Sequence, residues 1–466
     1  MRSNLIFDES PAHLTGLPNQ LWKYDIRLVM FNPRRIYTFL LWLLLPYIFF
    51  HLLWRAYKQR EYLQHIDERF GCYTARSDRP LIWLHTVSVG ETHAAVSLVQ
   101  RLRENYPHYQ LLLTHTTPTG RAASEQLYGS DVMRVYLPYD YPFAVKRFLQ
   151  HFRPRIGILM ETEIWFNLIH SCCIMQTPLL LLNARLSEKS AARYARYPNL
   201  TRLGLNELSA ISAQSEVDAA RMIELGANNV SVMGNLKFDI QPSSAMLKLG
   251  EQLRTQFGKN RKVFLLASTR VGEEVLLISM LKQVNIPHLL TVIVPRHPQR
   301  FDDVADVLTQ QGIRFQRRSE NCLIAPDTQV VLGDSMGEMF AYYAACDLAF
   351  IGGSLLPFGG QNLIEACSVG KPVFVGPHTY NFAQASQLAV ECGAALRIQN
   401  SADLAQSLQN LLAHPDQLIK IGHAGLHFVR THSGATEQAL RHITYFLDSH
   451  SSKIMQNKTT YQSSKP

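Results

Sequence analysis

Short apolar runs alternate with helix-like segments along most of the chain, and this alternation limits the fold more than any other feature. Strands that alternate with helical patterns predict a parallel sheet with helices on both faces. In the first half, the expected strands are Leu81–Val87, Gln110–Thr116, Met133–Leu137, Arg155–Met160, Pro178–Leu182, Ala210–Ala213 and Val230–Met233.

The rhythm breaks between Gly234 and Lys248, where Pro242 and two serines predict a boundary between domains. The chain of 466 residues is long enough for two domains of ordinary size. We therefore expect the α/β class, with two Rossmann-like, doubly wound domains that face a central cleft. The expected strands of the second half are Val263–Ala267, His288–Val294, Gln329–Leu332, Leu348–Ile351 and Pro372–Val375.

The most hydrophobic part of the chain, Ile36–Trp54, precedes both domains. It has no formal charge, has basic residues on both sides, and is just long enough to span a bilayer core as a helix. Pro46 and His51 count against a simple straight span, and no small-residue cleavage site follows, as a secretory signal would require. A buried helix of a soluble domain is the alternative. We favour an uncleaved membrane anchor that either spans the bilayer or inserts halfway.

These patterns divide the chain into five segments. We expect an N-terminal extension at 1–35, the anchor at 36–54, a first domain at 55–235, a second domain at 236–450 and a polar, disordered tail at 451–466.

Charge and cysteine usage narrow the classes of partner. Lys and Arg exceed Asp and Glu by 46 − 37 = 9, and the first 60 residues hold five of these nine charges (8 − 3). This placement favours an anionic membrane surface and argues against nucleic acid. The seven cysteines form no CxxC or zinc-type spacing, which predicts a reducing compartment and no metal site. Walker and GxGxxG loops are absent, so we expect no cofactor.

One carboxylate stands out in the first half. The stretch Leu81–Leu102 indicates a buried strand, a tight turn at Gly90 and a helix that begins near Glu91. In parallel sheets, ligands usually bind at the carboxyl ends of the strands, so Glu91 is expected to face a crevice. Ser88 and Glu91 also match a capping box, in which the carboxylate would only bond backbone at the helix start. This stretch alone slightly favours the capping interpretation.

Other charged residues follow neighbouring strands of the first half. Glu161 and Glu163 end a strand, and Lys237 lies at the domain boundary, where it would place a cation over the cleft. Each of them is, taken singly, also explained as an ordinary surface or capping residue.

Glycine-rich turns in the second half predict an anion site, because they expose backbone amides at helix starts. Glu338 and Glu365 would accept hydrogen bonds from ribose hydroxyls there. Both also fit capping boxes, with Ser335 and Asn362 as partners. The turns are Val294–Pro298, which contains Arg296, Gly333–Glu338, Gly352–Ser354 and Gly359–Asn362.

A series of longer motifs resembles the 3-deoxy-D-manno-octulosonic acid (Kdo) transferases, glycosyltransferases of lipopolysaccharide core biosynthesis with the two-lobed GT-B fold. The matches run in order from about residue 60 to 430. They are HTVSVGE (85–91), TPTG (117–120), YLPYD (136–140), METE (160–163), NARLS (183–187), NLKFD (235–239), PRHP (295–298), GDSMGEM (333–339) and GPHTYNF (376–382).

The resemblance implies roles for individual residues. Glu91 would be the general base, while Glu161 and Lys237 would stabilise the transition state. The resemblance implies no metal and no cofactor. Phe166 and Arg270 depart from the family pattern, and Arg270 leaves the donor side in question. CMP would contact Pro295, Arg296, Met336, Gly337, Glu338, Asn362, Leu363, Ile364 and Glu365.

The implied reaction moves Kdo from CMP-Kdo, with inversion, to the lipid A precursor (lipid IVA) at the cytoplasmic face of the inner membrane. Two alternatives share parts of this pattern. A nucleotide-sugar epimerase would share the glycine-rich turns but has no use for a membrane anchor. A non-enzymatic, membrane-tethered solute receptor would share the cleft but belongs outside the cytoplasm.

Overall fold

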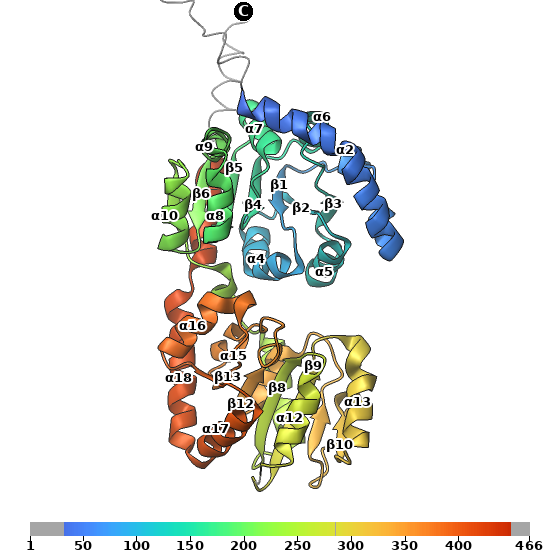
Figure 1. Cartoon of the computed structure of the whole chain (residues 1–466), viewed down its shortest axis with the longest axis vertical. Coiled ribbons are helices and arrows are strands. Elements are labelled where there is room, and N and C mark those ends of the chain that lie inside the picture. The colour runs from blue at the N-terminus through green and yellow to red at the C-terminus, as the bar shows by residue number, and fades with distance from the viewer. Residues whose placement is uncertain (1–31, 285, 449–466) are drawn as a thin grey trace, which may run out of the picture.

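The computed structural model describes residues 32–284 and 286–448. The expected tail and nearly all of the expected N-terminal extension lie outside these residues. The described chain forms two α/β lobes, one above the other in Figure 1, with α2 (Pro33–Lys58) along the outer side of the first. The predicted fold class is confirmed.

The first lobe is built on a seven-stranded parallel sheet. The chain adds strands outward from β1 to β3, then returns to β4 on the other side of β1 and continues to β7. The strand order is β3 (Met133–Tyr136), β2 (Gln110–His115), β1 (Leu81–His85), β4 (Ile156–Met160), β5 (Leu179–Ala184), β6 (Ala210–Ala213) and β7 (Val230–Val232). The helices are α3 (Val89–Ala94), α4 (Val96–Asn105), α5 (Pro118–Tyr128), α6 (Pro142–Phe152), α7 (Phe166–Ile174), α8 (Glu188–Ala195), α9 (Pro198–Glu207) and α10 (Glu216–Glu224).

The second lobe repeats this architecture with another seven-stranded parallel sheet. Its strand order is β10 (Phe315–Arg317), β11 (Val330–Leu332), β9 (Leu289–Pro295), β8 (Lys262–Thr269), β12 (Leu348–Ile351), β13 (Val373–Val375) and β14 (Ala395–Arg397). The helices are α11 (Ser244–Phe257), α12 (Glu273–Leu281), α13 (Phe301–Gln310), α14 (Met339–Ala345), α15 (Ile364–Ser368), α16 (Ala383–Glu391), α17 (Ser401–Ala413) and α18 (Pro415–His432). The edge strands β10 and β14 were not predicted, because three-residue strands with partly exposed side chains lack a continuous apolar run.

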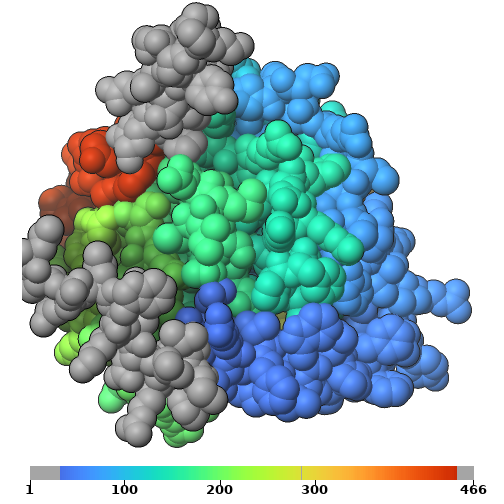
Figure 2. Space-filling model, turned by 90° about the horizontal axis from the view of Figure 1, so that it is seen from above, coloured from blue at the N-terminus to red at the C-terminus, as the bar shows by residue number. Residues whose placement is uncertain are grey.

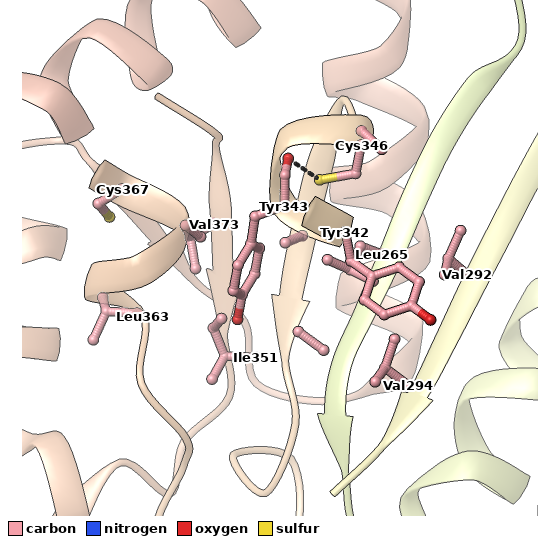
Figure 3. Close-up of a cluster of buried hydrophobic side chains, with 14 of the residues drawn as sticks. Leu265, Val292, Val294, Tyr342, Tyr343, Cys346, Ile351, Leu363, Cys367 and Val373 are labelled. Atoms are coloured by element: carbon pink, nitrogen blue, oxygen red, sulfur yellow. Dashed lines mark hydrogen bonds between the residues drawn. The ribbon is translucent and has the colours of Figure 1, made fainter. Parts of the chain in front are cut away.

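The core of the second lobe fixes α14 against the sheet. Tyr342 and Tyr343 point from this short helix toward opposite parts of the core, and both are at most 2% exposed. Figure 3 shows the Tyr342 ring beside Val294 on β9 and the Tyr343 ring beside Ile351 on β12. This packing holds the turn before α14 at the carboxyl edge of the sheet.

The end of the described chain returns to the first lobe. A last helix, residues 435–448, contributes Ala435, Ala439, Leu440, Ile443 and Leu447 to the core under β1, β2 and β4. The sequence-based boundaries assigned these residues to the second domain at 236–450, and the core contacts place them with the first. The pattern alone does not say which sheet a terminal amphipathic helix covers.

The two crossings between the lobes meet at one carboxylate. Asp239, just after the first crossing, accepts hydrogen bonds from the backbone N–H groups of Gly434 (2.6 Å) and Thr436 on the second crossing. The backbone carbonyl of Asp239 also accepts a bond from Ser97 on α4. A single short segment therefore ties the lobes together.

The apolar helix α2 is longer than the predicted anchor at 36–54 and lies against the first lobe. Its first half is attached by Tyr37 and Thr38, which donate to Asp140 and Asn167 at 2.9 Å each. Near its other end, Leu52 and Ala56 are buried against Tyr62. Most of its other large apolar side chains are exposed, so the alternative of a buried core helix is wrong. Among the described helices, only α2 is long and apolar enough to cross a membrane, and its exposed surface fits membrane association.

Candidate active site

The candidate site lies where the strand order of the first sheet reverses, between β1 and β4. Strands β1 and β4 are hydrogen-bonded neighbours, although the chain leaves them toward opposite edges of the sheet. Such a reversal opens a crevice at the carboxyl ends of the two strands. Glu91 follows β1 and Glu161 follows β4, so the topology brings together two carboxylates that are 70 residues apart in the sequence.

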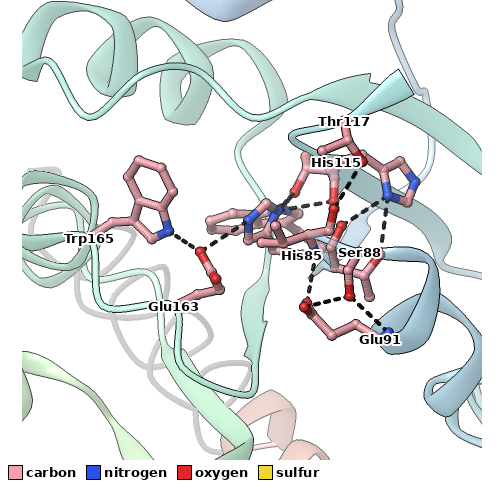
Figure 4. A network of polar contacts seen from close by, with 11 residues as sticks. His85, Ser88, Glu91, His115, Thr117, Glu163 and Trp165 are labelled. Carbon is pink, nitrogen blue, oxygen red and sulfur yellow. Dashed lines mark hydrogen bonds and ion pairs between the residues drawn. The ribbon is translucent and has the colours of Figure 1, made fainter. Parts of the chain in front are cut away.

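Glu91 is nearly buried, at 8% exposed, and its carboxylate is held by local donors. It accepts hydrogen bonds from Val87 N–H at 2.7 Å and from the Ser88 hydroxyl at 2.9 Å. Ser88 Oγ in turn accepts from Glu91 N–H at 3.2 Å and caps α3. Figure 4 shows this arrangement at the helix start. The expected capping contact is therefore present, although Glu91 bonds the backbone of Val87 instead of Ser88.

The capping hydrogen bonds do not explain the raised pKa of Glu91, because they lower it. Burial, with smaller contributions from the nearby charges of Glu161 and Glu163, raises the pKa of its carboxyl to about 7, against the lowering effect of its hydrogen bonds. A carboxylate with a pKa near 7 is well matched to accept a proton at neutral pH. The same residue thus caps a helix and has the acidity of a general base.

Glu161 and Lys237 meet across the crevice. The Lys237 ammonium lies 3.9 Å from Glu161 Oε1 and 5.2 Å from the centre of the Phe382 ring, which belongs to the second lobe. Glu161 has a left-handed backbone (φ 59°), a conformation that costs energy in a non-glycine residue and often marks functional sites. The structure thus places the predicted cation between the lobes.

A layer of buried polar residues supports the floor of the crevice. His85 and His115 are fully buried at the ends of β1 and β2 and contact the Thr114 and Thr86 side chains at 2.8 Å and 3.2 Å. Burial lowers the pKa of His85 to about 3 and that of His115 to about 4, so both are neutral at pH 7. His85 Nε2 lies 4.0 Å from Glu163. The structure thus gives both histidines a supporting position near Glu91.

The second lobe presents its own crevice between the neighbouring strands β8 and β12. Gly352 follows β12, and a Cβ there would come within 2.4 Å of the Ser268 carbonyl, so only glycine fits. The backbone that follows is held by Glu273, a fully buried residue of α12 that sequence reasoning missed. Its carboxylate accepts from the N–H groups of Gly353 (2.6 Å) and Leu355 (3.0 Å). The sequence signal for this residue is the acidic pair Glu273 and Glu274 at the start of the helix.

Arg296 and Glu365 face the cleft from the predicted nucleotide turns. Arg296 follows β9, and its charge lowers the pKa of His93 in the first lobe, an effect second to burial. Burial raises the pKa of Glu365 to about 7, and Asn362 and Arg296 oppose that rise. Asn362 Nδ2 donates to Glu365 at 3.1 Å, as the capping alternative requires. These residues therefore share one neighbourhood.

The remaining residues predicted to contact CMP differ in burial, in backbone conformation and in hydrogen-bond partners. Leu363 and Ile364 are fully buried in the core, so their side chains do not face a ligand. Met336 is 56% exposed, and Gly337 has φ +80°, which favours glycine. Glu338 is already bonded by Ser335 Oγ at 2.6 Å and lies 3.4 Å from Arg318. Pro295 ends β9 and is buried.

The site has carboxylates on the carboxyl edge of one sheet and glycine-rich turns with an arginine on the facing edge of the other. Across residues 32–284 and 286–448, no group of three or more His, Cys, Asp or Glu is arranged to hold a metal ion. Two doubly wound lobes that meet in this way form the GT-B fold. A glycosyltransferase from Rickettsia africae shares the fold, with a TM-score of 0.54 at 13% identity over 80% of this chain and 99% of that chain.

Sequence comparisons identify the family. Residues 64–240 match the family model described as 3-deoxy-D-manno-octulosonic-acid transferase (kdotransferase). The chain is 40% identical to the 3-deoxy-D-manno-octulosonic acid transferase of Bordetella pertussis, over 87% of this chain and 98% of that protein. It is 36% identical to that of Haemophilus influenzae, over 89% and 99%. The chain belongs to the Kdo transferase family and is a glycosyltransferase that transfers Kdo in lipopolysaccharide core biosynthesis.

Proposed function

We propose that this Kdo transferase uses CMP-Kdo as donor and the lipid A precursor (lipid IVA) as acceptor, and that it inverts the anomeric configuration. The observation that carries this proposal is Glu91, whose pKa of about 7 and place at the crevice suit it to receive the proton of an acceptor hydroxyl. The nucleotide would bind the facing turns of the second lobe.

The proposed transfer of Kdo needs no cofactor. The acceptor oxygen forms a bond to the anomeric carbon of Kdo as its proton passes to Glu91. The bond between that carbon and the phosphate oxygen breaks, and CMP leaves with the electron pair. Arg296 and backbone amides at the nucleotide turns would stabilise the charge on the departing phosphate. Lys237, over Phe382 and beside Glu161, would balance negative charge on the donor.

The proposed location follows from α2. Its contacts with Asp140, Asn167 and Tyr62 hold the helix along the lobe, so it would lie in the plane of the membrane with its exposed apolar face in the lipid. We place the crevice at the cytoplasmic face of the inner membrane, where the lipid acceptor is within reach.

The test is transfer from CMP-Kdo to lipid IVA by Glu91→Gln, timed under single-turnover conditions. We expect a rate loss of about 10²–10⁴-fold, typical of a lost general base. A glutamine still accepts one hydrogen bond at the helix start, so the melting curve and CMP affinity should stay close to wild type.

Arg296→Ala is the matched comparison, because it should weaken CMP binding by about 1.5–3 kcal/mol, the range for a charge-assisted hydrogen bond. Near-normal transfer by Glu91→Gln would remove Glu91 as the base. Failure of the wild type to transfer Kdo from CMP-Kdo would overturn the proposed donor.

A further inference from the structure

A second hollow lies beside the crevice, between α2 and the carboxyl ends of β2, β3 and β4. This pocket has a volume of about 240 Å³. The α2 side supplies His51 and Arg55, and the side of the lobe supplies Arg69, Thr116 and Trp165. Figure 2 shows α2 in dark blue along one edge of this end of the molecule.

Arg69 is the unusual residue of this pocket, because its guanidinium is buried and incompletely bonded. The side chain is only 4% exposed. Nη1 donates to the Thr116 carbonyl at 3.1 Å, and the plane stacks 4.1 Å from the centre of the Tyr136 ring. Nε and Nη2 are buried and form no hydrogen bond of ordinary geometry among the described residues, and the Tyr139 hydroxyl is the polar group close to the guanidinium. Buried donors without acceptors are costly, so this arrangement calls for a ligand that accepts hydrogen bonds.

The neighbouring carboxylate of Glu68 does not serve as an acceptor for the Arg69 guanidinium. Glu68, the preceding residue, bonds Arg121 at 2.9 Å and accepts from Tyr136 N–H at 2.7 Å. Neither Arg69 nor Arg55 forms an ion pair with any described residue at 4.0 Å or less. The Glu68 carboxylate pairs with Arg121 instead. The pocket therefore has uncompensated positive charge from both of its walls.

Two guanidiniums on opposite walls suit a phosphate group, which accepts several charge-assisted hydrogen bonds in the plane of each guanidinium. Arg55 is exposed on α2 and lies 5.1 Å from the centre of the Tyr62 ring, which limits its freedom. A phosphate in the pocket would lie beside both arginines, because Arg55 and Arg69 both line it.

The surroundings indicate that the phosphate belongs to a lipid. Large apolar side chains of α2 near the pocket point outward, including Tyr47 (65% exposed), Phe50 (69%) and Trp54 (54%). Acyl chains next to these residues would bring a head group to the mouth of the pocket. On the inner side, Trp165 lines the pocket and donates to Glu163 at 2.6 Å, so the pocket and the crevice share a wall.

We propose that the pocket between Arg55 and Arg69 binds a phosphate monoester of the lipid acceptor and so orients its sugar hydroxyl toward Glu91. The identity of this lipid as the acceptor rests on the proposed function. The binding of a phosphate monoester lipid does not, and it is tested separately.

The binding test uses the full chain and vesicles of phosphatidylcholine that contain either phosphatidic acid, a monoester, or phosphatidylglycerol, a diester, at equal surface charge. The wild type should bind the monoester vesicles about tenfold more tightly, and Arg69→Met and Arg55→Met should each lose this preference while still binding through α2. Methionine preserves the apolar stem of each side chain. Arg55 is exposed, so its variant should fold even where Arg69→Met does not. Lys58→Met, on the same helix outside the pocket, is the control and should keep the preference.

Equal binding of the two vesicle types by the wild type would overturn the pocket assignment. Loss of the preference in Lys58→Met would also overturn it, because general charge would then explain the effect. Inorganic phosphate alone, at the concentration of the lipid phosphate, should not displace the vesicles; displacement would assign the pocket to the free ion.

Kinetics distinguish the acceptor role from lipid binding in general. Arg55→Met should raise KM for the phosphorylated lipid acceptor about tenfold, with little change in kcat or in CMP affinity. With an enzymatically dephosphorylated acceptor, wild type and variant should have the same KM. An unchanged KM for the phosphorylated acceptor, alongside a retained vesicle preference in the wild type, would reject the role in acceptor orientation. Absence of transfer by the wild type would instead reject the proposed function.

Discussion

At the scale of single residues, Glu91 shows why one motif allows two interpretations, a helix cap and a general base. Ser88-x-x-Glu91 predicts a cap, and the structure contains one. Its raised pKa depends on burial and on Glu161 and Glu163, residues that the sequence places 70 or more positions away. Local pattern therefore predicts the cap, and only tertiary contacts give the acidity of a base.

The acidity gives a prediction about pH. A general base must be deprotonated, so kcat/KM for Kdo transfer should fall below pH 7, about tenfold for each pH unit, and level off above it. Glu161→Gln removes a negative neighbour and should move the midpoint to lower pH, since a nearby carboxylate raises the pKa of Glu91. The measurement is a pH profile of kcat/KM for both proteins. A flat profile across pH 5–8 in the wild type would contradict the assignment.

At the scale of elements, the prediction from sequence was good for strands and incomplete for α2. The apolar run predicted a helix, and Asn32 and Pro33, which begin it, are ordinary start signals. The docking of α2 could not be predicted, because it depends on Tyr37 and Thr38 meeting Asp140 and Asn167 from distant parts of the chain. A run that is hydrophobic on all sides does not indicate which side touches the protein.

Asp140 makes the attachment of α2 testable. Its carboxylate accepts from the N–H groups of Asn167 (3.0 Å) and Leu168 (2.8 Å) at the start of α7, and from the Tyr37 hydroxyl. Asp140→Asn has only one accepting oxygen, so a buried donor loses its partner and stability should fall by about 1–3 kcal/mol. Asp78→Asn, exposed on the same lobe, is the control and should leave the melting temperature unchanged.

The same pair of proteins gives a stability difference that depends on pH. Burial raises the pKa of Asp140 from 3.8 to about 7. The folded state then binds the proton more tightly than the unfolded state, so the group stabilises the fold below about pH 4 and this contribution is lost as the pH rises toward 7. The difference in melting temperature between wild type and Asp140→Asn should shrink over that range. A difference that grows with pH would show that the carboxylate is ionised throughout.

At the scale of the whole molecule, the two sheets were predictable and the path of the chain between them was not. Apolar runs identified the strands that lie inside each sheet, because burial on both faces leaves a continuous signal. The return of residues 435–448 to the first lobe has no such signal. An amphipathic helix fits either sheet, and its place depends on the crossing that Asp239 ties down.

Ile443→Ala tests this return of the chain. Ile443 is fully buried in the core beneath β1 and β4, so its truncation should destabilise the first lobe by about 2–5 kcal/mol through lost burial and a cavity. Hydrogen exchange should then show lost protection for the amides of β1 and β2, while β8 and β9 keep theirs. Ile278→Ala, in the core of the second lobe, is the matched variant and should give the reverse pattern. If Ile443→Ala instead exposed β8 and β9, the last helix would belong to the second lobe, as the sequence boundary at 236–450 had it, and the double crossing between the lobes would be wrong.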